Sequence, residues 1–167
     1  NTYSKSGTDD ISYGNHHLIK KDQNGDVWIG YSGNGIARVD PETKEFVRYT
    51  ADPNDKNALS GNYVTGIWVD DSNTVWFSTT NGLNRYNKDS DTFTSWTTEN
   101  SRLPSNSLST IYKDSRDILW LGTKKHNYDI SSSGDYGLIR FDPNSEAAAL
   151  YQHDRLDVNS LSNDAIN

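Results

Sequence analysis

An internal repeat constrains the fold of this chain more than any other feature of its sequence. Three tryptophans share one column of the repeat, and an aspartate precedes each by six positions: Asp22 and Trp28, Asp70 and Trp76, Asp114 and Trp120. The tryptophans are separated by 48 and then by 44 residues. A fixed period of this length indicates that each copy folds as one unit and stacks against its neighbours.

Further columns extend the repeat beyond the tryptophan. Each copy has a glycine after the tryptophan and an arginine three residues later: Gly35 and Arg38, Gly82 and Arg85, Gly137 and Arg140. Three full copies are predicted at 11–58, 59–102 and 103–160, the third lengthened by an inserted loop at 124–136. Residues 1–10 are interpreted as the tail of a preceding copy, and residues 161–167 as the start of the next.

Each copy is expected to form four short strands. In the second copy, β-branched and aromatic residues concentrate in four segments, 64–69, 74–79, 83–86 and 92–96, separated by polar turn residues. Only 145–150 shows the spacing of an amphipathic helix. Four antiparallel strands repeated about every 45 residues are typical of a β-propeller blade.

The expected fold is therefore all-β, a propeller fragment of three four-stranded antiparallel blades with partial blades at both ends. Three blades do not close a ring, because propellers use about four to eight. We expect the chain to be a piece of a larger ring, with closure by a second copy of itself as the alternative. The chain begins with asparagine and contains no methionine, which favours a processed chain or an excised segment.

Composition excludes several classes of function. The net charge of −7 leaves no basic surface for a nucleic-acid backbone, and the apolar runs fall far short of the roughly 20 residues of a membrane helix. The chain has no cysteine, so disulfides and thiolate metal sites are excluded. Five Trp, ten Tyr and four Phe supply bulky side chains for a packed core.

The repeat resembles the two-component regulator propeller repeat over essentially the whole chain. The second copy carries the resemblance in LSGNYVTGIWVD at 59–70, VWFST at 75–79 and NGLNRY at 81–86. The first copy departs from the pattern, since Gly14 stands in the column of Asn62 and Asn106, and His16 in an apolar column.

This resemblance implies a non-catalytic segment of the sensor region of a membrane-bound histidine kinase, often a hybrid one. Such a region lies on the periplasmic or extracellular side, and its signal is expected to be glycan-related, with a glycan or oligosaccharide as ligand. Its other partners would be further blades of the parent chain, and it would reach the membrane only through that chain. Two alternatives stay open: a propeller glycosidase or lyase, and a protein-binding or dimerising propeller that forms homodimers.

No catalytic residue, metal or cofactor is expected. The stretch DQNGD at 22–26 opens like a calcium loop, but no glutamate stands where such a loop needs one at its end, so an Asx turn is favoured. Adjacent His16 and His17 point to opposite faces of a strand and cannot share a metal ion. The aspartates and arginines of the repeat recur in every copy, which is typical of scaffold residues that brace the blades or their carboxylates.

Ligand-binding residues are expected where the copies differ. The loops between second and third strands and the loops between blades share one face of a propeller. The candidates on that face are Tyr31, Asn34, Asn81, Lys124, Lys125, His126 and Tyr128. The inserted loop combines planar, hydrogen-bonding and cationic groups, as a sugar or an anionic glycan site would; an ordinary surface loop is the alternative.

Overall fold

The structure is a computed structural model that describes residues 16–124 and 136–166. In these residues the fold is all-β, with three four-stranded antiparallel sheets and no helix. The strands of the first two sheets follow their order in the chain, β1-β2-β3-β4 and β5-β6-β7-β8, and the third sheet is β9-β10-β11-β12. The expected all-β fold of four-stranded sheets is confirmed.

The strand bounds are as follows. The first sheet contains β1 (His16–Lys21), β2 (Val27–Tyr31), β3 (Ile36–Val39) and β4 (Phe46–Tyr49). The second contains β5 (Val64–Val69), β6 (Val75–Thr79), β7 (Gly82–Asn87) and β8 (Thr92–Trp96). The third contains β9 (Leu108–Lys113), β10 (Leu119–Thr123), β11 (Leu138–Phe141) and β12 (Ala148–Tyr151).

The four strands predicted for the second copy are confirmed, with shifts of one residue at three ends. The helical spacing at 145–150 does not produce a helix, because this segment ends in β12, where Leu150 lies opposite Ile139 of β11. Pairing with a neighbouring strand therefore outweighs a short local pattern.

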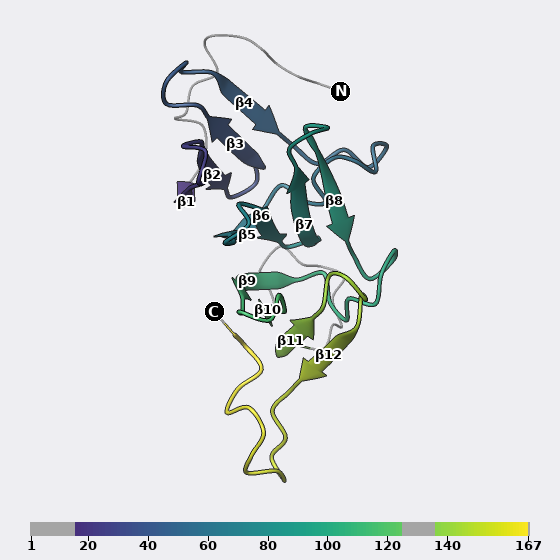
Figure 1. Cartoon of the computed structure of the whole chain (residues 1–167). Coiled ribbons are helices and arrows are strands. Elements are labelled where there is room, and N and C mark those ends of the chain that lie inside the picture. The colour runs from purple at the N-terminus through teal and green to yellow at the C-terminus, as the bar shows by residue number, and fades with distance from the viewer. Residues whose placement is uncertain (1–15, 125–135, 167) are drawn as a thin grey trace.

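The three sheets, hereafter the first, second and third blades, stack one after another along the molecule (Figure 1). The first strands of the blades, β1, β5 and β9, contact one another in sequence. Trp28 of the first blade packs on Phe77 and Tyr86 of the second, with ring centroids 5.3 and 4.7 Å apart. Trp96 of the second blade contacts Phe141 of the third at 6.1 Å.

Two apolar clusters fill the spaces between the blades. One joins the first blade to the second around Trp28 and Phe77, and the other joins the second blade to the third around Trp76 and Phe141. Each aromatic ring removes a large apolar area from water, so the stability of the stack depends on these contacts between sheets. The three described blades form an open stack and not a closed ring.

Candidate functional site

The aspartate and tryptophan of the repeat are joined by a hydrogen bond in every blade. Asp22 Oδ2 accepts from the Trp28 indole at 3.0 Å, while its Oδ1 accepts from the amides of Asn24 at 2.9 Å and Asp26 at 3.1 Å. The same contacts recur in the other two blades, with indole distances of 3.3 Å for Asp70 and Trp76 and 3.1 Å for Asp114 and Trp120.

These bonds explain why the aspartate recurs. Its carboxylate closes the turn between the first two strands and holds the indole N–H, which would otherwise be buried without an acceptor. Both oxygens of Asp22 are thus engaged within its own blade, as in the Asx turn predicted at 22–26. Among residues 16–124 and 136–166, no group of three or more potential metal-ligating side chains comes together.

Two arginines of the repeat, Arg38 and Arg85, lie on aromatic rings. The guanidinium carbon of Arg38 is 5.9 Å from the ring centre of Trp28 and 5.7 Å from that of Tyr86, and Arg38 donates a 2.6 Å hydrogen bond to the Tyr86 hydroxyl. Arg85 lies equally close to Trp76 and Trp96, at 5.8 and 5.7 Å. Arg38 therefore connects two blades through cation–π contacts and a phenol hydroxyl.

The sequence candidates on the loop face divide between the three blades. Asn34 is exposed after β2, Asn81 is exposed after β6 and donates to the Ser60 carbonyl at 2.7 Å, and Lys124 follows β10. Antiparallel strands place these positions at the same end of the sheets. The other predicted residues of the inserted loop, Lys125, His126 and Tyr128, lie outside the described residues.

Tyr31 differs from the other candidates because its side chain is fully buried. It ends β2 and packs beside Ile29 and Ala37, with the guanidinium of Arg48 4.6 Å from its ring centre. In the described structure, Tyr31 therefore contributes to the packing of the first blade and offers no surface to a ligand.

A pocket of about 280 Å³ lies at the opposite end of the sheets, between the β5–β6 and β9–β10 turns. Trp68 and Tyr112 form one wall as an edge-to-face pair with centroids 4.8 Å apart. The Tyr112 side chain is exposed, and that of Trp68 is half-buried. This aromatic pair offers apolar surface next to polar groups, which is the usual composition of a small-molecule site.

The polar wall of this pocket is organised by Lys113. Its ammonium group lies 2.7 Å from Asp70 Oδ2 and 2.7 Å from Asp117 Oδ1. Burial alone would raise the pKa of Asp70, but hydrogen bonds from Lys113, Thr74 and Trp76 outweigh burial and hold that pKa below its usual value. Asp70 is therefore a fixed anion beside the pocket.

Burial opposes the charge of Lys113, but its hydrogen bonds with Asp117 and Asp70 raise its pKa above the usual value. Lys113 thus stays a cation that joins two blades. Three exposed polar residues complete the lining and can hydrogen-bond a ligand: Asp71, Ser72 and Ser115.

Reasoning from the sequence missed Trp68 and Tyr112. They occupy one column of the repeat, directly after the isoleucines Ile67 and Ile111, where the first copy has Lys20. A signal was present, because a lysine, which is rarely buried, shares this column with two bulky aromatics and so indicates that the column lies at the surface.

The described residues contain no helix with the length and apolar character needed to cross a bilayer.

Comparison with known families and proteins supports the interpretation of the repeat. Residues 102–125 match the family model described as "Two component regulator propeller". Over 68 residues, the chain is 31% identical to histidine kinase P4 of Formosa agariphila; the alignment covers 41% of this chain and 5% of the kinase.

Solved structures share the fold. The chain is 21% identical to the extracellular domain of a putative hybrid two component system from B. thetaiotaomicron, with a TM-score of 0.74 over 90% of this chain and 20% of that one. A second such domain from B. thetaiotaomicron is 19% identical, with a TM-score of 0.67 over 90% of this chain and 18% of that one. Virginiamycin B lyase of Staphylococcus aureus is 20% identical, with a TM-score of 0.58 over 84% and 42%.

The chain thus spans only a small part of the kinase and of these extracellular domains. The match at 102–125 supports the resemblance to the two-component regulator propeller repeat. The propeller fold expected from the sequence is confirmed, and the described residues form an open run of β-propeller blades.

Proposed function

We propose that this chain is a non-catalytic part of the sensor region of a two-component histidine kinase, of the hybrid kind. The observation that carries the proposal is the match of residues 102–125 to the regulator propeller family. The shared fold with extracellular domains of putative hybrid two component systems supports it. On this proposal the blades lie on the periplasmic or extracellular face of a membrane-anchored parent chain.

The proposed signal is glycan-related, and the pocket beside Trp68 and Tyr112 is the proposed contact for it. Aromatic rings pack against the apolar C–H faces of sugars, while hydroxyl and carboxylate groups such as those of Ser72 and Asp71 bind sugar hydroxyls. The volume of about 280 Å³ is near the lower end of the range of small-molecule pockets, which suits a short stretch of sugar.

Binding of the purified chain to a glycan array, followed by calorimetry with the oligosaccharides that bind, tests this part of the proposal. Tyr112→Ala should weaken binding at least about tenfold, as expected for loss of one desolvated aromatic contact. Tyr63→Ala is the matched control, because Tyr63 is a partly exposed tyrosine at the opposite end of the sheets. Loss of binding in Tyr63→Ala alone would move the site to the loop face, and an array without hits would contradict a glycan ligand.

Signal output from the parent kinase tests the sensor role separately. A ligand changes output only if it binds two conformations of the sensor with different affinity. Tyr112→Ala should therefore raise the ligand concentration needed for half-maximal autophosphorylation, without changing the activity at zero ligand. A kinase whose output ignores every oligosaccharide bound by the blades would contradict the sensor assignment.

The enzyme alternative finds less support in the described residues. A glycosidase needs two carboxyl groups on either side of the bond that is cleaved. Asp22, Asp70 and Asp114 each bind an indole and turn amides, so the carboxylates of the repeat have structural roles. The likeness to virginiamycin B lyase, at 20% identity, concerns the fold.

A further inference from the structure

A hydrogen bond from an aromatic residue to a carboxylate links each blade to the next. Tyr49, at the end of β4, donates its hydroxyl to Asp91 Oδ1 of the second blade at 2.6 Å. Trp96, at the end of β8, donates its indole N–H to Glu146 Oε1 of the third blade at 3.0 Å. We call this contact the latch: an aromatic donor on the last strand of one blade and an acid on the following blade.

The acids of the latch share one backbone position. Asp91 and Glu146 both lie in the turn before the last strand of their blade, and both have a left-handed backbone, with φ of 53° and 56°. Lys44 occupies the same place in the first blade, with φ of 61°. This conformation is uncommon for residues other than glycine, so its recurrence indicates that the turn fixes the direction of the side chain.

Tyr151 ends β12 at the position that Tyr49 and Trp96 hold in their blades. Its side chain is 45% exposed, whereas those of Tyr49 and Trp96 are 8% and 5% exposed. Trp120 is likewise half-buried, although Trp28 and Trp76 are buried beneath the next blade. The face that carries Trp120 and Tyr151 therefore offers the hydrogen-bond donor of a latch. Within the described residues, no following blade covers this face.

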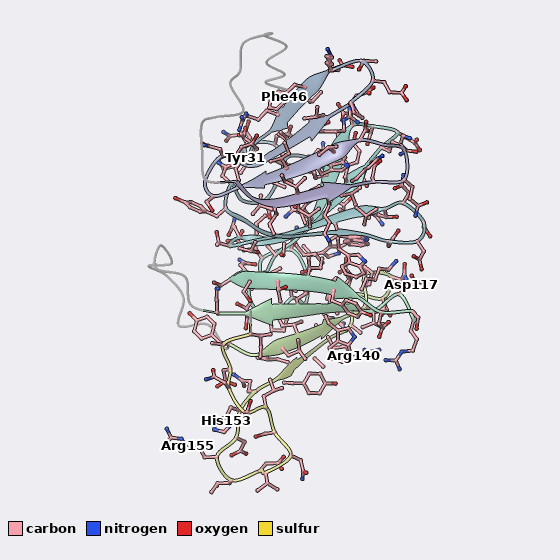
Figure 2. The ribbon with its side chains drawn as sticks, turned by 90° about the vertical axis from the view of Figure 1, so that its left-hand side faces the viewer. Tyr31, Phe46, Asp117, Arg140, His153 and Arg155 are labelled. Atoms are coloured by element: carbon pink, nitrogen blue, oxygen red, sulfur yellow. The ribbon has the colours of Figure 1, made fainter. Side chains whose placement is uncertain are left out.

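This face is hollow. A pocket of about 530 Å³ lies against it, lined by Trp120, Leu138 and Tyr151 and by the segment that follows β12. In Figure 2, Arg140, His153 and Arg155 lie toward one end of the stack, and Tyr31 and Phe46 lie toward the other. Arg140 lies opposite Trp120 in the β10–β11 pair, as Arg38 lies opposite Trp28.

The segment 161–166 already has the contacts that begin a following blade. Asn62 Oδ1 accepts from the Ala51 amide at 2.7 Å and Asn106 Oδ1 from the Thr98 amide at 2.8 Å, at the entries to the second and third blades. Asp164 Oδ1 accepts from the His153 amide at the corresponding place.

Apolar packing repeats in the same way. Val64, which begins β5, lies against Gly30 so closely that a methyl group on the glycine would be 2.9 Å from it. Ile166 lies against Gly122 with the same spacing of 2.9 Å. The chain after β12 therefore enters the position of a first strand on the third blade.

We propose that the face formed by Trp120, Arg140 and Tyr151 docks a fourth blade of the same repeat, which carries Asp or Glu at the left-handed position of its last turn. That acid accepts the hydrogen bond of the Tyr151 hydroxyl and completes a third latch. This deepens the proposed function by specifying one further blade of the parent, and it stands or falls independently of any signal.

A second copy of this chain fits the face less well. The first blade of that copy would present Lys44 at the latch position, and an ammonium group has no acceptor for the Tyr151 hydroxyl. The observed latches use carboxylates at this position in both junctions. The turn thus selects a following blade with an acid over the first blade of a second copy.

An extended chain tests the proposal. Residues 161–167 are replaced by a copy of residues 59–102, whose natural place is after a blade that ends in Tyr49, the counterpart of Tyr151. Footprinting with a photoactivated carbene, read by mass spectrometry, should show about fivefold less labelling of Tyr151 in the extended chain. This factor follows from the exposed fractions of 45% for Tyr151 and 8% for Tyr49.

The latch itself is tested by Tyr151→Phe. The substitution should lower the melting temperature of the extended chain by about 3–8 °C, as expected for loss of one charge-assisted hydrogen bond, and should leave that of the 167-residue chain within about 1 °C. D91K in the appended copy should remove this difference, and D91E should restore it.

Three results would overturn the proposal. One is an equal effect of Tyr151→Phe in both chains. Another is unchanged labelling of Tyr151 with this graft and also with a graft of residues 103–160, which carries Glu146. The third is a dimer of the 167-residue chain, seen by sedimentation, in which Tyr151 becomes protected. None of these measurements uses a glycan or a kinase, so a failed signal assay leaves their outcome unaffected.

Discussion

The Lys113 ammonium of the third blade lies 2.7 Å from the Asp70 carboxylate of the second. Asp70 also holds the Trp76 indole of its own blade. One carboxylate therefore closes a turn, fixes a buried ring and receives a cation from the next blade.

This ion pair predicts acid sensitivity. Because the pKa of Asp70 is lowered in the fold, its contribution to stability is present above its usual value of 3.8 and is lost as the pH falls from there through the lower folded pKa. Lys113→Met should reduce stability at pH 7 and make the loss below pH 4 shallower, as measured by urea unfolding between pH 2 and 7. Arg116→Met is the control, since Arg116 is exposed and pairs with Asp114 within its own blade, without joining two blades. An unchanged acid profile in Lys113→Met would contradict this role.

The hydrogen bond between Asp22 and Trp28 predicts that replacing one carboxylate greatly lowers the stability of the fold. Asp22→Ala removes the acceptor of a fully buried indole N–H and of two turn amides. The free energy of unfolding should fall by about 2–4 kcal/mol, because a buried donor without a partner costs about 1–3 kcal/mol by itself. Asp40→Ala, in a turn where the carboxylate accepts from the Glu42 and Thr43 amides and holds no buried indole, should cost less than Asp22→Ala. Equal costs would show that the indole bond contributes nothing.

Tyr49, which lies between the first and second blades, predicts that the stability of the fold depends on pH in the alkaline range. Burial, followed by its hydrogen bond to Asp91, raises the pKa of Tyr49 well above its usual value of 10. A raised pKa gives stability that is full below pH 10 and declines as the pH rises above that value, because the unfolded state loses its proton first. Tyr49→Phe should therefore make stability fall less steeply above pH 10. Guanidinium unfolding of this variant and of the unsubstituted protein at pH 8–11 checks the slope, and an equal slope in both would contradict this role of Tyr49.

Substitution of two glycines distinguishes the cost of an unfavourable backbone conformation from the cost of a steric clash. Gly35 has φ of 70°, and a Cβ there would lie 2.1 Å from the Tyr49 carbonyl oxygen; Gly25 has φ of 100° with open space around it. Gly25→Ala should cost about 1 kcal/mol from backbone conformation alone. Gly35→Ala should cost at least about 2 kcal/mol more, because the last strand of the blade must move. Thermal unfolding of both variants checks this order, and a smaller loss in Gly35→Ala would refute it.

The sequence predicted the blades well because the information lies in repeated columns. The Trp28, Trp76 and Trp120 column marks the second strand of each blade, and the glycines mark the following turn. Local residue types were sufficient here, since each blade forms its hairpins from neighbouring segments of the chain.

The candidate site was harder to predict, because it depends on where each side chain points and on which side chains of another blade lie beside it. Tyr31 stands beside a turn in the sequence, but its side chain is fully buried beside Ile29 and Ala37. Trp68 and Tyr112 meet only when two blades stack, and no spacing along the chain reveals that contact. The arginines were expected to brace the blades or their carboxylates, and the structure places Arg38 and Arg85 on rings.

The turn position shared by Lys44, Asp91 and Glu146 has a consequence for how such a chain assembles. Near-identical repeats risk docking out of order while they fold, since every blade offers similar apolar faces. The first blade has a lysine at this position and the next two have acids, so a first blade docked in place of a later one forfeits the hydrogen bond to a carboxylate. The residue at a single turn position can thus help each blade to dock on its correct neighbour during folding.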